Sequence, residues 1–267
     1  MVYFVATPIG NLKDISLRAL ETLRSADVIY CEDTRHSLRL LNAYEIKKPL
    51  VACHKFNERS AAEKIISDAR EGKNVAIISD AGMPVISDPG AQVCEELKKA
   101  EEEYTVVPGA NAAPSALILS AMPSARFAFI GFLPDKSGER KRLLEKYADC
   151  DLTLIFHAAP QDVDRYIADM FEVFGDRPAC AVREITKLHE ESISFTLADG
   201  LEGEKRGEYV LIIGGAPEKQ SDLCSLSEEE HIRHYMQQGL DKKEAVKRAA
   251  KDRGLTRSEM YKFGINL

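Results

Sequence analysis

The sequence predicts an α/β fold: two α/β domains followed by a small C-terminal helical module. Short apolar runs alternate with amphipathic helical patterns through most of the chain, and the alternation pauses once, at Met122–Arg126. After a polar break at Ala216–Ser225 the chain is purely helical. Strands that alternate with helices form largely parallel sheets covered by helices. The expected parts are α/β domains at residues 1–122 and 123–217 and a helix-turn-helix-like module at residues 225–267.

The composition is that of a soluble globular protein. Of the 267 residues, 45% are hydrophobic and 30% are charged, which excludes a disordered chain. The net charge of −7 gives no global positive field, so a polyanionic partner needs a local basic patch. No apolar run approaches the roughly 18 residues that span a bilayer, so we expect no membrane contact.

The cysteines and the N-terminus predict a cytoplasmic protein. The six cysteines lie far apart with no C-x-x-C pair, which disfavours a zinc site or a disulfide framework and suits buried thiols in a reducing compartment. Met1–Ala6 lacks a basic region and runs into a turn, so it predicts a strand and not a signal peptide.

Each predicted strand is a short apolar run. In chain order the strands are Val2–Thr7, Val28–Cys31, Leu50–Cys53, Val75–Ser79, Thr105–Val107, Phe127–Phe132, Leu152–His157, Ala179–Arg183, Ser192–Thr196 and Tyr209–Gly214. Between the strands, apolar residues recur at helical spacing. The predicted helices are Ser16–Ser25, Ser60–Glu71, Gly90–Glu102, Pro114–Ala121, Lys136–Ala148 and Asp162–Phe174.

The C-terminal module is predicted to hold three short helices joined by tight turns. Ser227 followed by Glu230 is typical of a capping box that opens the first helix. Gly239 ends this helix, and Asp241 caps the second. Gly254 ends the second helix, and Thr256 or Ser258 begins the third.

The common nucleotide and hydrolase fingerprints are absent from the sequence, including G-x-x-x-x-G-K-[ST], G-x-G-x-x-G, H-E-x-x-H and G-x-S-x-G. Three turn-rich segments follow strands instead, at Ala6–Leu12, Ser79–Gly90 and Val107–Pro114. Ligands of open α/β sheets bind beyond the carboxyl ends of the strands, where these segments must gather. Together they predict a nucleoside-type pocket.

Longer stretches of sequence surround these turns. They are A-T-P-I-G-N-L-K-D-I-S-L-R-A at Ala6–Ala19, E-D-T-R at Glu32–Arg35, I-S-D-A-G-M-P-V-I-S-D-P-G at Ile78–Gly90, G-F-L-P-D-K at Gly131–Lys136, R-E-I-T-K at Arg183–Lys187 and G-E-Y-V at Gly207–Val210. The chain resembles the tetrapyrrole methylase superfamily (class III methyltransferases), and within it the branch that methylates bacterial ribosomal RNA. The turn motifs are shared with precorrin methylases, whereas E-D-T-R and R-E-I-T-K are more specific to the ribosomal RNA branch.

The resemblance implies a methyltransferase that uses S-adenosylmethionine to methylate the ribose 2′-hydroxyl of a cytidine in the decoding region of 16S rRNA. It implies 16S rRNA or the 30S subunit as partner, a cofactor cleft between the two domains, and a homodimer. The residues that it assigns to the cofactor are Pro8, Gly10, Asp80, Ala81, Gly82, Pro84, Asn111, Ala112 and His157. The sequence departs from the branch at His157–Gln161, which reads H-A-A-P-Q in place of E-[SA]-P-H-R, and at Met83, where Thr is common.

Positioning should supply most of the catalysis, because the methyl group of a sulfonium is already activated. Alignment of two bound reactants lowers a barrier by roughly 7–11 kcal/mol, whereas acid–base help contributes about 10²–10⁴-fold. No metal is needed. The candidate proton acceptors are Asp33, Glu184 and Glu32, with Lys187 if burial lowers its pKa. The alternatives are that Asp33 caps a helix and pairs with Arg35, and that Arg183–Glu184 forms an ion pair at a strand end.

Candidate substrate-binding residues are polar or basic and follow predicted strands: Glu32, Arg35, His54, Lys55, Asn57, Lys136 and Arg183. Arg59, Arg140, Lys141 and Arg142 follow strand ends as well. Phe56 is either a base-stacking aromatic or a core residue. The segment Asp241–Lys262 holds eight basic and four acidic residues, which favours an accessory that contacts rRNA over an ordinary solvated face.

Two other functions stay open. A small-molecule methylase acting on a tetrapyrrole would share the fold and cofactor, but E-D-T-R and the basic module have no obvious use on a macrocycle. A non-catalytic RNA-binding protein would explain the departure at His157–Gln161, but three intact turn motifs argue against it.

Overall fold

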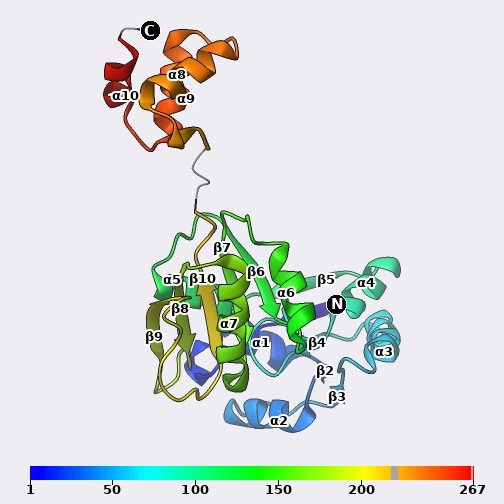
Figure 1. Ribbon diagram of the computed structural model, residues 1–267. Coiled ribbons are helices and arrows are strands. Elements are labelled where there is room, and N and C mark those ends of the chain that lie inside the picture. The colour runs from blue at the N-terminus through cyan, green and yellow to red at the C-terminus, as the bar shows by residue number, and fades with distance from the viewer. Residues whose placement is uncertain (218–221, 266) are drawn as a thin grey trace. The chain divides into compact units, whose positions relative to one another are not determined.

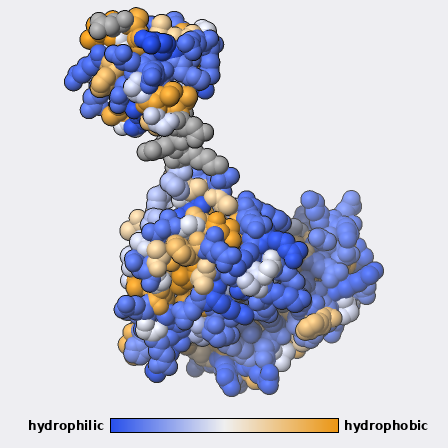
Figure 2. Space-filling view, viewed as in Figure 1, coloured by the Kyte–Doolittle hydropathy of each residue, from blue (hydrophilic) through white to orange (hydrophobic). Residues whose placement is uncertain are grey.

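The computed structural model describes residues 1–217, 222–265 and 267, which form two compact units, Met1–Gly215 and Ala216–Leu267 (Figure 1). Residues 218–221 of the predicted polar break, and Asn266 of the predicted module, lie outside the described residues. In the part of the chain that the structure describes, no helix has the length and apolarity needed to cross a membrane. Hydrophilic residues cover most of the visible surface of each unit (Figure 2).

The first sheet is entirely parallel, with strand order β3-β2-β4-β1-β5, as the alternation of strands and helices predicts. Its strands are β1 (Val2–Val5), β2 (Val28–Cys31), β3 (Leu50–Ala52), β4 (Val75–Ile78) and β5 (Tyr104–Val107). Its helices are α1 (Leu17–Ser25), α2 (Thr34–Ala43), α3 (Glu58–Arg70) and α4 (Ala91–Lys99), with the 3-10 turn η1 (Leu12–Asp14) before α1. The spacing of apolar residues does not predict α2. Only the alternative in which Asp33 caps a helix predicts a helix at this position.

Both faces of this sheet are buried because side chains alternate along each strand. In β2, Tyr30 packs in a cluster with Ile65 of α3 and Leu97 of α4, whereas Ile29 packs on the other face with Leu23 of α1 and Leu41 of α2. Helices therefore cover the two faces, and the strand ends stay free for ligand contacts.

The second sheet has the order β6-β7-β10-β8-β9, and only β6 and β7 are parallel. Its strands are β6 (Phe127–Phe132), β7 (Thr153–Ala158), β8 (Pro178–Arg183), β9 (Glu191–Thr196) and β10 (Tyr209–Ile213). The prediction of a largely parallel sheet is wrong here. Parallel neighbours need a long crossover, whereas β8, β9 and β10 follow one another through connections that contain no helix.

Helices cover both faces of the second sheet as well. The 3-10 turn η2 (Pro160–Asp162) leads into α7 (Val163–Phe174), which lies with α6 (Ser137–Glu145) on one face. On the other face, α5 (Ala112–Ser120) packs Ala116 and Leu117 against Ile155 and Val210. The boundary expected after residue 122 places α5 in the first domain, but its buried face belongs to the core of the second sheet.

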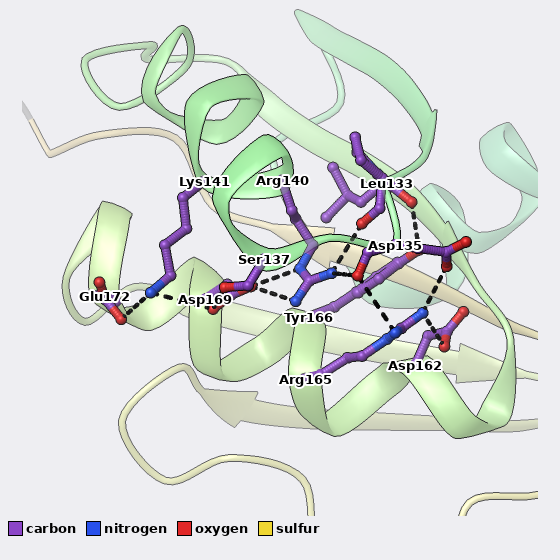
Figure 3. Close-up of polar contacts among 11 residues, drawn as sticks. Leu133, Asp135, Ser137, Arg140, Lys141, Asp162, Arg165, Tyr166, Asp169 and Glu172 are labelled. Atoms are coloured by element: carbon purple, nitrogen blue, oxygen red, sulfur yellow. Dashed lines mark hydrogen bonds and ion pairs between the residues drawn. The ribbon is translucent and has the colours of Figure 1, made fainter.

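A buried ion pair joins α6 to α7 (Figure 3). Arg140 is only 3% exposed, and its guanidinium lies 2.5 Å from the carboxylate of Asp169. Arg140 also donates to the backbone carbonyls of Pro134 and Asp135, at 2.8 and 2.9 Å. Arg140, one of the basic residues that follow predicted strand ends, is therefore not available to RNA, because its side chain fixes the segment that follows β6.

The C-terminal unit contains the predicted helices: α8 (Glu228–Gln237), α9 (Lys242–Asp252) and α10 (Arg257–Gly264), preceded by the 3-10 turn η3 (Asp222–Ser225). Ser227 and Glu230 form the predicted capping box, and Thr256 begins α10 with a second one. Asp241 caps α9 by accepting a hydrogen bond from the Glu244 amide. The three helices enclose a small apolar core of their own.

Candidate active site

A cavity of about 400 Å³ lies between the two sheets of the larger unit, beyond the carboxyl ends of β1, β2 and β4. Residues from both sheets line it. They are Ile9, Glu32, Asp80, Ala81, Ile86, Ser87, Asp88 and Ala112 from the first half, and Phe132, His157, Ala158, Ala159, Pro160, Glu184, Ile185, Lys187, Glu208, Tyr209 and Val210 from the second. This is the position at which open α/β sheets bind ligands.

Backbone hydrogen bonds tie together the three loops that the sequence singles out. The Thr7 amide donates to the Gly82 carbonyl at 2.9 Å, and the Gly82 amide donates back to Thr7 at 3.1 Å. The Ala6 amide donates to Val107 at 3.0 Å, which joins the third loop to the first. Gly82 has φ of +82°, and a Cβ there would lie 3.2 Å from the Ile9 side chain. The turn therefore requires glycine, and the loops gather as predicted.

The turn before α4 is strained. Val85 and Ser87 have φ of 76° and 66°, a left-handed conformation that costs a β-branched residue such as Val on the order of 1–3 kcal/mol. The Ser87 hydroxyl oxygen packs against Gly131 of the second half. This conformation brings Ile86, Ser87 and Asp88 to the cavity wall.

Three carboxyl groups stand on the first wall of the cavity: Glu32, Asp80 and Asp88. Burial raises the pKa of Asp88 to about 6, and the neighbouring Asp80 charge acts in the same direction. Burial also raises the pKa of Glu32, with further contributions from Asp80 and Asp88. The wall therefore favours a cationic ligand.

The opposite wall carries Lys187, whose ammonium lies 3.0 Å from Glu184 and 3.5 Å from Glu208. Burial lowers the pKa of Lys187, but these two carboxylates outweigh burial and the net pKa is raised. Lys187 is a candidate base only if burial lowers its pKa, and because the pKa is raised, Lys187 stays protonated and cannot accept the proton. Lys187 crosses directly over Gly10, where a Cβ would lie 2.6 Å from its Cγ. Gly10 thus admits the lysine side chain from the other half of the molecule.

His157 lies on the second wall among aromatic side chains, with a buried ring nitrogen. Its ring makes edge contacts with Phe129 and Phe132 at 5.0 and 5.2 Å. Burial lowers its pKa, so the ring is neutral at pH 7. Its Nε2 is buried and has no hydrogen-bond partner among the described residues, which leaves it available to a ligand.

The structure places the predicted residues in two groups. Those that line the cavity are Glu32, Asp80, Ala81, Ala112, His157, Glu184 and Lys187. Those outside its lining are Pro8, Gly10, Gly82, Pro84, Asn111, Asp33, Arg35, His54, Lys55, Asn57, Lys136 and Arg183. Sequence reasoning missed Asp88, Glu208 and Phe132, although all three belong to motifs that it quoted.

Asp33 is the N-cap of α2, and the alternative interpretation of E-D-T-R describes it correctly. Its carboxylate accepts from the Arg35 amide at 2.8 Å and forms an ion pair with the Arg35 guanidinium at 2.9 Å. These contacts lower the pKa of Asp33 to about 2, so it is a weak base. Arg183 forms an ion pair at the end of β8, but its partner is Glu191 at 2.7 Å, and Glu184 pairs with Lys187 instead.

The loop after β3 is held by Asn57, whose side chain accepts from the His54 amide at 2.7 Å and donates to Ala52 at 3.0 Å. Asn57 therefore shapes the loop. Phe56 is 93% exposed, so its interpretation as a core residue is wrong. Its ring lies 6.2 Å from that of His54, and together they form an open aromatic surface. Lys136 is exposed at the start of α6.

No cluster of three or more His, Cys, Asp or Glu side chains suited to a metal ion occurs within the described ranges.

Comparison with known proteins agrees with this architecture. Residues 1–200 match the family model of tetrapyrrole (corrin/porphyrin) methylases. The chain is 40% identical to ribosomal RNA small subunit methyltransferase I of Bacillus subtilis, covering 98% of this chain and 92% of the relative. It is 35% identical to the protein of that name from Synechocystis, covering 100% and 98%.

Solved structures share the fold at lower identity. A diphthine synthase aligns with a TM-score of 0.65 and 14% identity, over 80% of this chain and 89% of that one. A uroporphyrin-III C-methyltransferase from Thermus thermophilus, complexed with S-adenyl homocysteine, aligns with a TM-score of 0.56 and 21% identity, over 80% and 96%. The chain therefore belongs to the tetrapyrrole (corrin/porphyrin) methylase family and, within it, groups with the ribosomal RNA small subunit methyltransferase I proteins.

Proposed function

We propose that this chain transfers a methyl group from S-adenosylmethionine to the ribose 2′-hydroxyl of a cytidine in the decoding region of 16S rRNA. The observation that carries the proposal is the cavity between the sheets, which combines a carboxylate wall with an unpartnered histidine nitrogen. The near-full-length relatives named for small-subunit rRNA methylation, and the fold neighbour complexed with S-adenyl homocysteine, support the choice of reactants.

The cavity fits S-adenosylmethionine. Its volume of about 400 Å³ lies within the usual range of small-molecule sites, roughly 300–1,000 Å³. Glu32, Asp80 and Asp88 complement the sulfonium and ammonium charges, and the free Nε2 of His157 can hydrogen-bond to a nucleoside or amino acid group. When bound, the cofactor supplies a methyl group on a positively charged sulfur, which is neutral once the methyl has left.

The residues proposed to hold the cofactor either contact it directly or shape the loops around it. Asp80, Ala81, Ala112 and His157 contact it from the cavity walls. The others shape the loops from behind, and they are Pro8, Gly10, Gly82, Pro84 and Asn111, the last of which caps α5 through the Ala113 amide at 3.1 Å.

Lys187 serves the RNA, since it faces the cavity as a cation. The exposed side chains Arg35, Lys55, Phe56 and Lys136 extend the proposed RNA surface beyond the cavity. His54, Glu32 and Arg183 complete the substrate-binding set proposed from the sequence.

The C-terminal unit supplies further phosphate contacts. Within Asp241–Lys262, Lys242 donates to the Ile265 and Leu267 carbonyls, Arg253 pairs with Glu228, and the exposed Lys247 pairs with Glu244. The exposed basic residues are Lys243, Lys247, Arg248, Lys251, Arg257 and Lys262. Counterion release at such contacts makes affinity depend steeply on salt.

We also propose a cytoplasmic homodimer. The proposed rRNA substrate supports a cytoplasmic location. Leu17 of α1 and Ile118 of α5 are 79% and 78% exposed, which suits contact with a second copy of this chain. Light scattering of the purified protein tests this, and a monomeric mass would refute it.

Methyl transfer from radiolabelled S-adenosylmethionine to naked 16S rRNA, 30S subunits and a uroporphyrinogen tests the function. We expect label in RNA, at a cytidine whose 3′ linkage resists alkaline hydrolysis because its 2′-oxygen is blocked. Label in the tetrapyrrole would favour the small-molecule methylase. RNA binding with no transfer to any acceptor would favour a non-catalytic RNA-binding protein.

A further inference from the structure

We propose that Asp88 is the proton acceptor of the methyl transfer, held at the cavity wall by the strained turn at Val85–Ser87. This inference rests on the proposed function, because it assigns a role within that reaction. Asp88 was not among the proton acceptors that the sequence suggested.

The turn is anchored on both sides of Asp88. Before it, the Ser87 hydroxyl packs against Gly131 of the second half. After it, the amides of Gly90 and Gln92 both donate to the Glu58 carboxylate at 3.1 Å. A conformation that is costly in isolation persists only where the surroundings impose it, and such strain gathers at functional sites. The result of this strain is a carboxylate facing the cavity.

The other carboxylates near the cavity are occupied. Asp33 caps α2 and pairs with Arg35. Glu184 accepts from Lys187 and from the Glu208 amide, and this lowers its pKa. Asp80 accepts from the Asp33 amide at 3.3 Å. Within the described ranges Asp88 and Glu32 have no ion-pair partner and accept no backbone amide, although Asp88 accepts a hydrogen bond from the Ser79 side chain, so the choice lies between these two.

The groups around Asp88 come from several elements. From the first half these are Ser79 and Asp80 after β4 and Glu32 after β2, and Glu32 in turn lies near Asp33 and His54. From the second half these are His157, Glu184, Lys187 and Glu208. Burial, together with Asp80, puts the pKa of Asp88 at about 6. A general base is most effective when its pKa lies just below the working pH, since it is then both ionised and basic.

The step balances without another reactant. A lone pair of the ribose oxygen forms the new O–C bond, the S–C bonding pair stays on sulfur, and the hydroxyl proton moves to a carboxylate oxygen of Asp88. As the positive charge on sulfur disappears, the affinity of the adjacent carboxylate for a proton rises. Charge loss on one reactant thereby assists proton removal from the other.

The same wall should distinguish cofactor from product. A cation gains from the ionised Asp88, whereas neutral S-adenosylhomocysteine does not. As pH falls from 7 to 5, Asp88 becomes protonated, so affinity for S-adenosylmethionine should fall several-fold while affinity for S-adenosylhomocysteine stays nearly constant. Isothermal calorimetry on the full chain measures both without any turnover.

The test compares Asp88→Asn with Glu32→Gln, since each removes one carboxylate from the same wall at almost constant size. Asp88→Asn should lose the pH dependence of S-adenosylmethionine affinity and lower single-turnover methyl transfer at pH 7.5 by about 10²-fold or more. Glu32→Gln should weaken cofactor binding and, because Glu32 belongs to the proposed substrate-binding set, lower the rate on rRNA, but at saturating cofactor it should keep the acidic loss of rate. Unchanged S-adenosylhomocysteine binding shows that each variant is folded.

Two outcomes would overturn the inference. One is an Asp88→Asn variant that transfers methyl groups at the wild-type rate with saturating cofactor, and the other is loss of the acidic limb in Glu32→Gln in place of Asp88→Asn. A wild-type protein that binds S-adenosylmethionine but methylates no rRNA contradicts the proposed function instead, so the two failures are distinguishable.

Discussion

At the scale of single residues, Gly82 shows how one backbone conformation shapes the cavity. Its φ of +82° costs an L-residue roughly 1–2 kcal/mol, and a Cβ there would lie 3.2 Å from Ile9, which lines the cavity. We predict that Gly82→Val abolishes S-adenosylmethionine binding, measured by calorimetry, and leaves the protein folded. Gly72→Val is the matched control, because Gly72 has φ of +83° and nothing within 4 Å. Equal affinities in the two variants would contradict the placement.

Lys187 tests the division of the cavity between its two ligands. A hydrogen bond to a charged group contributes roughly 1.5–3 kcal/mol, so Lys187→Ala should lower turnover on rRNA on the order of 10- to 100-fold. Affinity for S-adenosylmethionine should stay nearly unchanged, since an ammonium does not attract a cation. The raised pKa of Lys187 keeps it protonated, so the defect should not vary between pH 6 and 8.

The control for Lys187 is Arg35, whose side chain is 87% exposed and lies outside the cavity lining. Arg35→Ala should weaken rRNA binding and reduce its salt dependence while also sparing the cofactor. A fall in cofactor affinity that parallels the loss of turnover in either variant would show that the residue serves the cofactor.

At the scale of elements, the ion pair between α6 and α7 should govern the stability of the second half (Figure 3). Arg140→Met removes the closest partner of the buried Asp169 carboxylate and leaves it only Ser137 and the Lys141 ammonium at 3.5 Å; loss of a buried partner typically costs about 3–5 kcal/mol. The double variant Arg140→Met/Asp169→Leu should recover most of that loss, because no charge stays buried. Urea unfolding measures all three proteins. A double variant less stable than Arg140→Met would contradict this expectation and show that Asp169 stabilises the fold through Ser137 and Lys141 even without Arg140.

The sequence predicts elements better than it predicts their pairing. Apolar periodicity locates the strands, and cap residues such as Ser227 and Thr256 locate helix starts, because both depend on neighbours within one turn. The absence of a predicted helix between β8, β9 and β10 already favours their antiparallel pairing, whereas the strand order β6-β7-β10-β8-β9 depends on long-range packing that no local pattern records. The same limit applies to the site. The chemistry of Asp88 arises from burial and backbone strain, and the pKa of Lys187 from two carboxylates that reach it in the folded chain.

At the scale of the whole molecule, the division into two compact units separates the cavity from the basic C-terminal helices. Every residue that lines the cavity belongs to the larger unit. Truncation after Ser221 should therefore leave S-adenosylmethionine affinity unchanged. It should lower rRNA affinity and flatten its dependence on salt, in proportion to how many of the deleted basic residues meet phosphates.

Filter binding of rRNA at several salt concentrations measures that effect. A full-length variant with Lys243, Lys247 and Lys251 changed to Gln is the matched comparison, since it removes charge and keeps the unit. Unchanged affinity and salt slope in both proteins would mean that the C-terminal unit acts in packing or in dimer formation.

The position of α5 determines where this chain can be divided or recombined with a relative. By chain order α5 follows the first sheet, yet Ala116 and Leu117 complete the core of the second, and Ala112 at its start lines the cavity. A fragment that begins after residue 122 would lack α5, which covers one face of the second sheet, and would leave Ile155 and Val210 exposed to solvent. Exchange of halves between relatives would therefore succeed only if the junction precedes α5, so that the helix travels with the sheet that it covers.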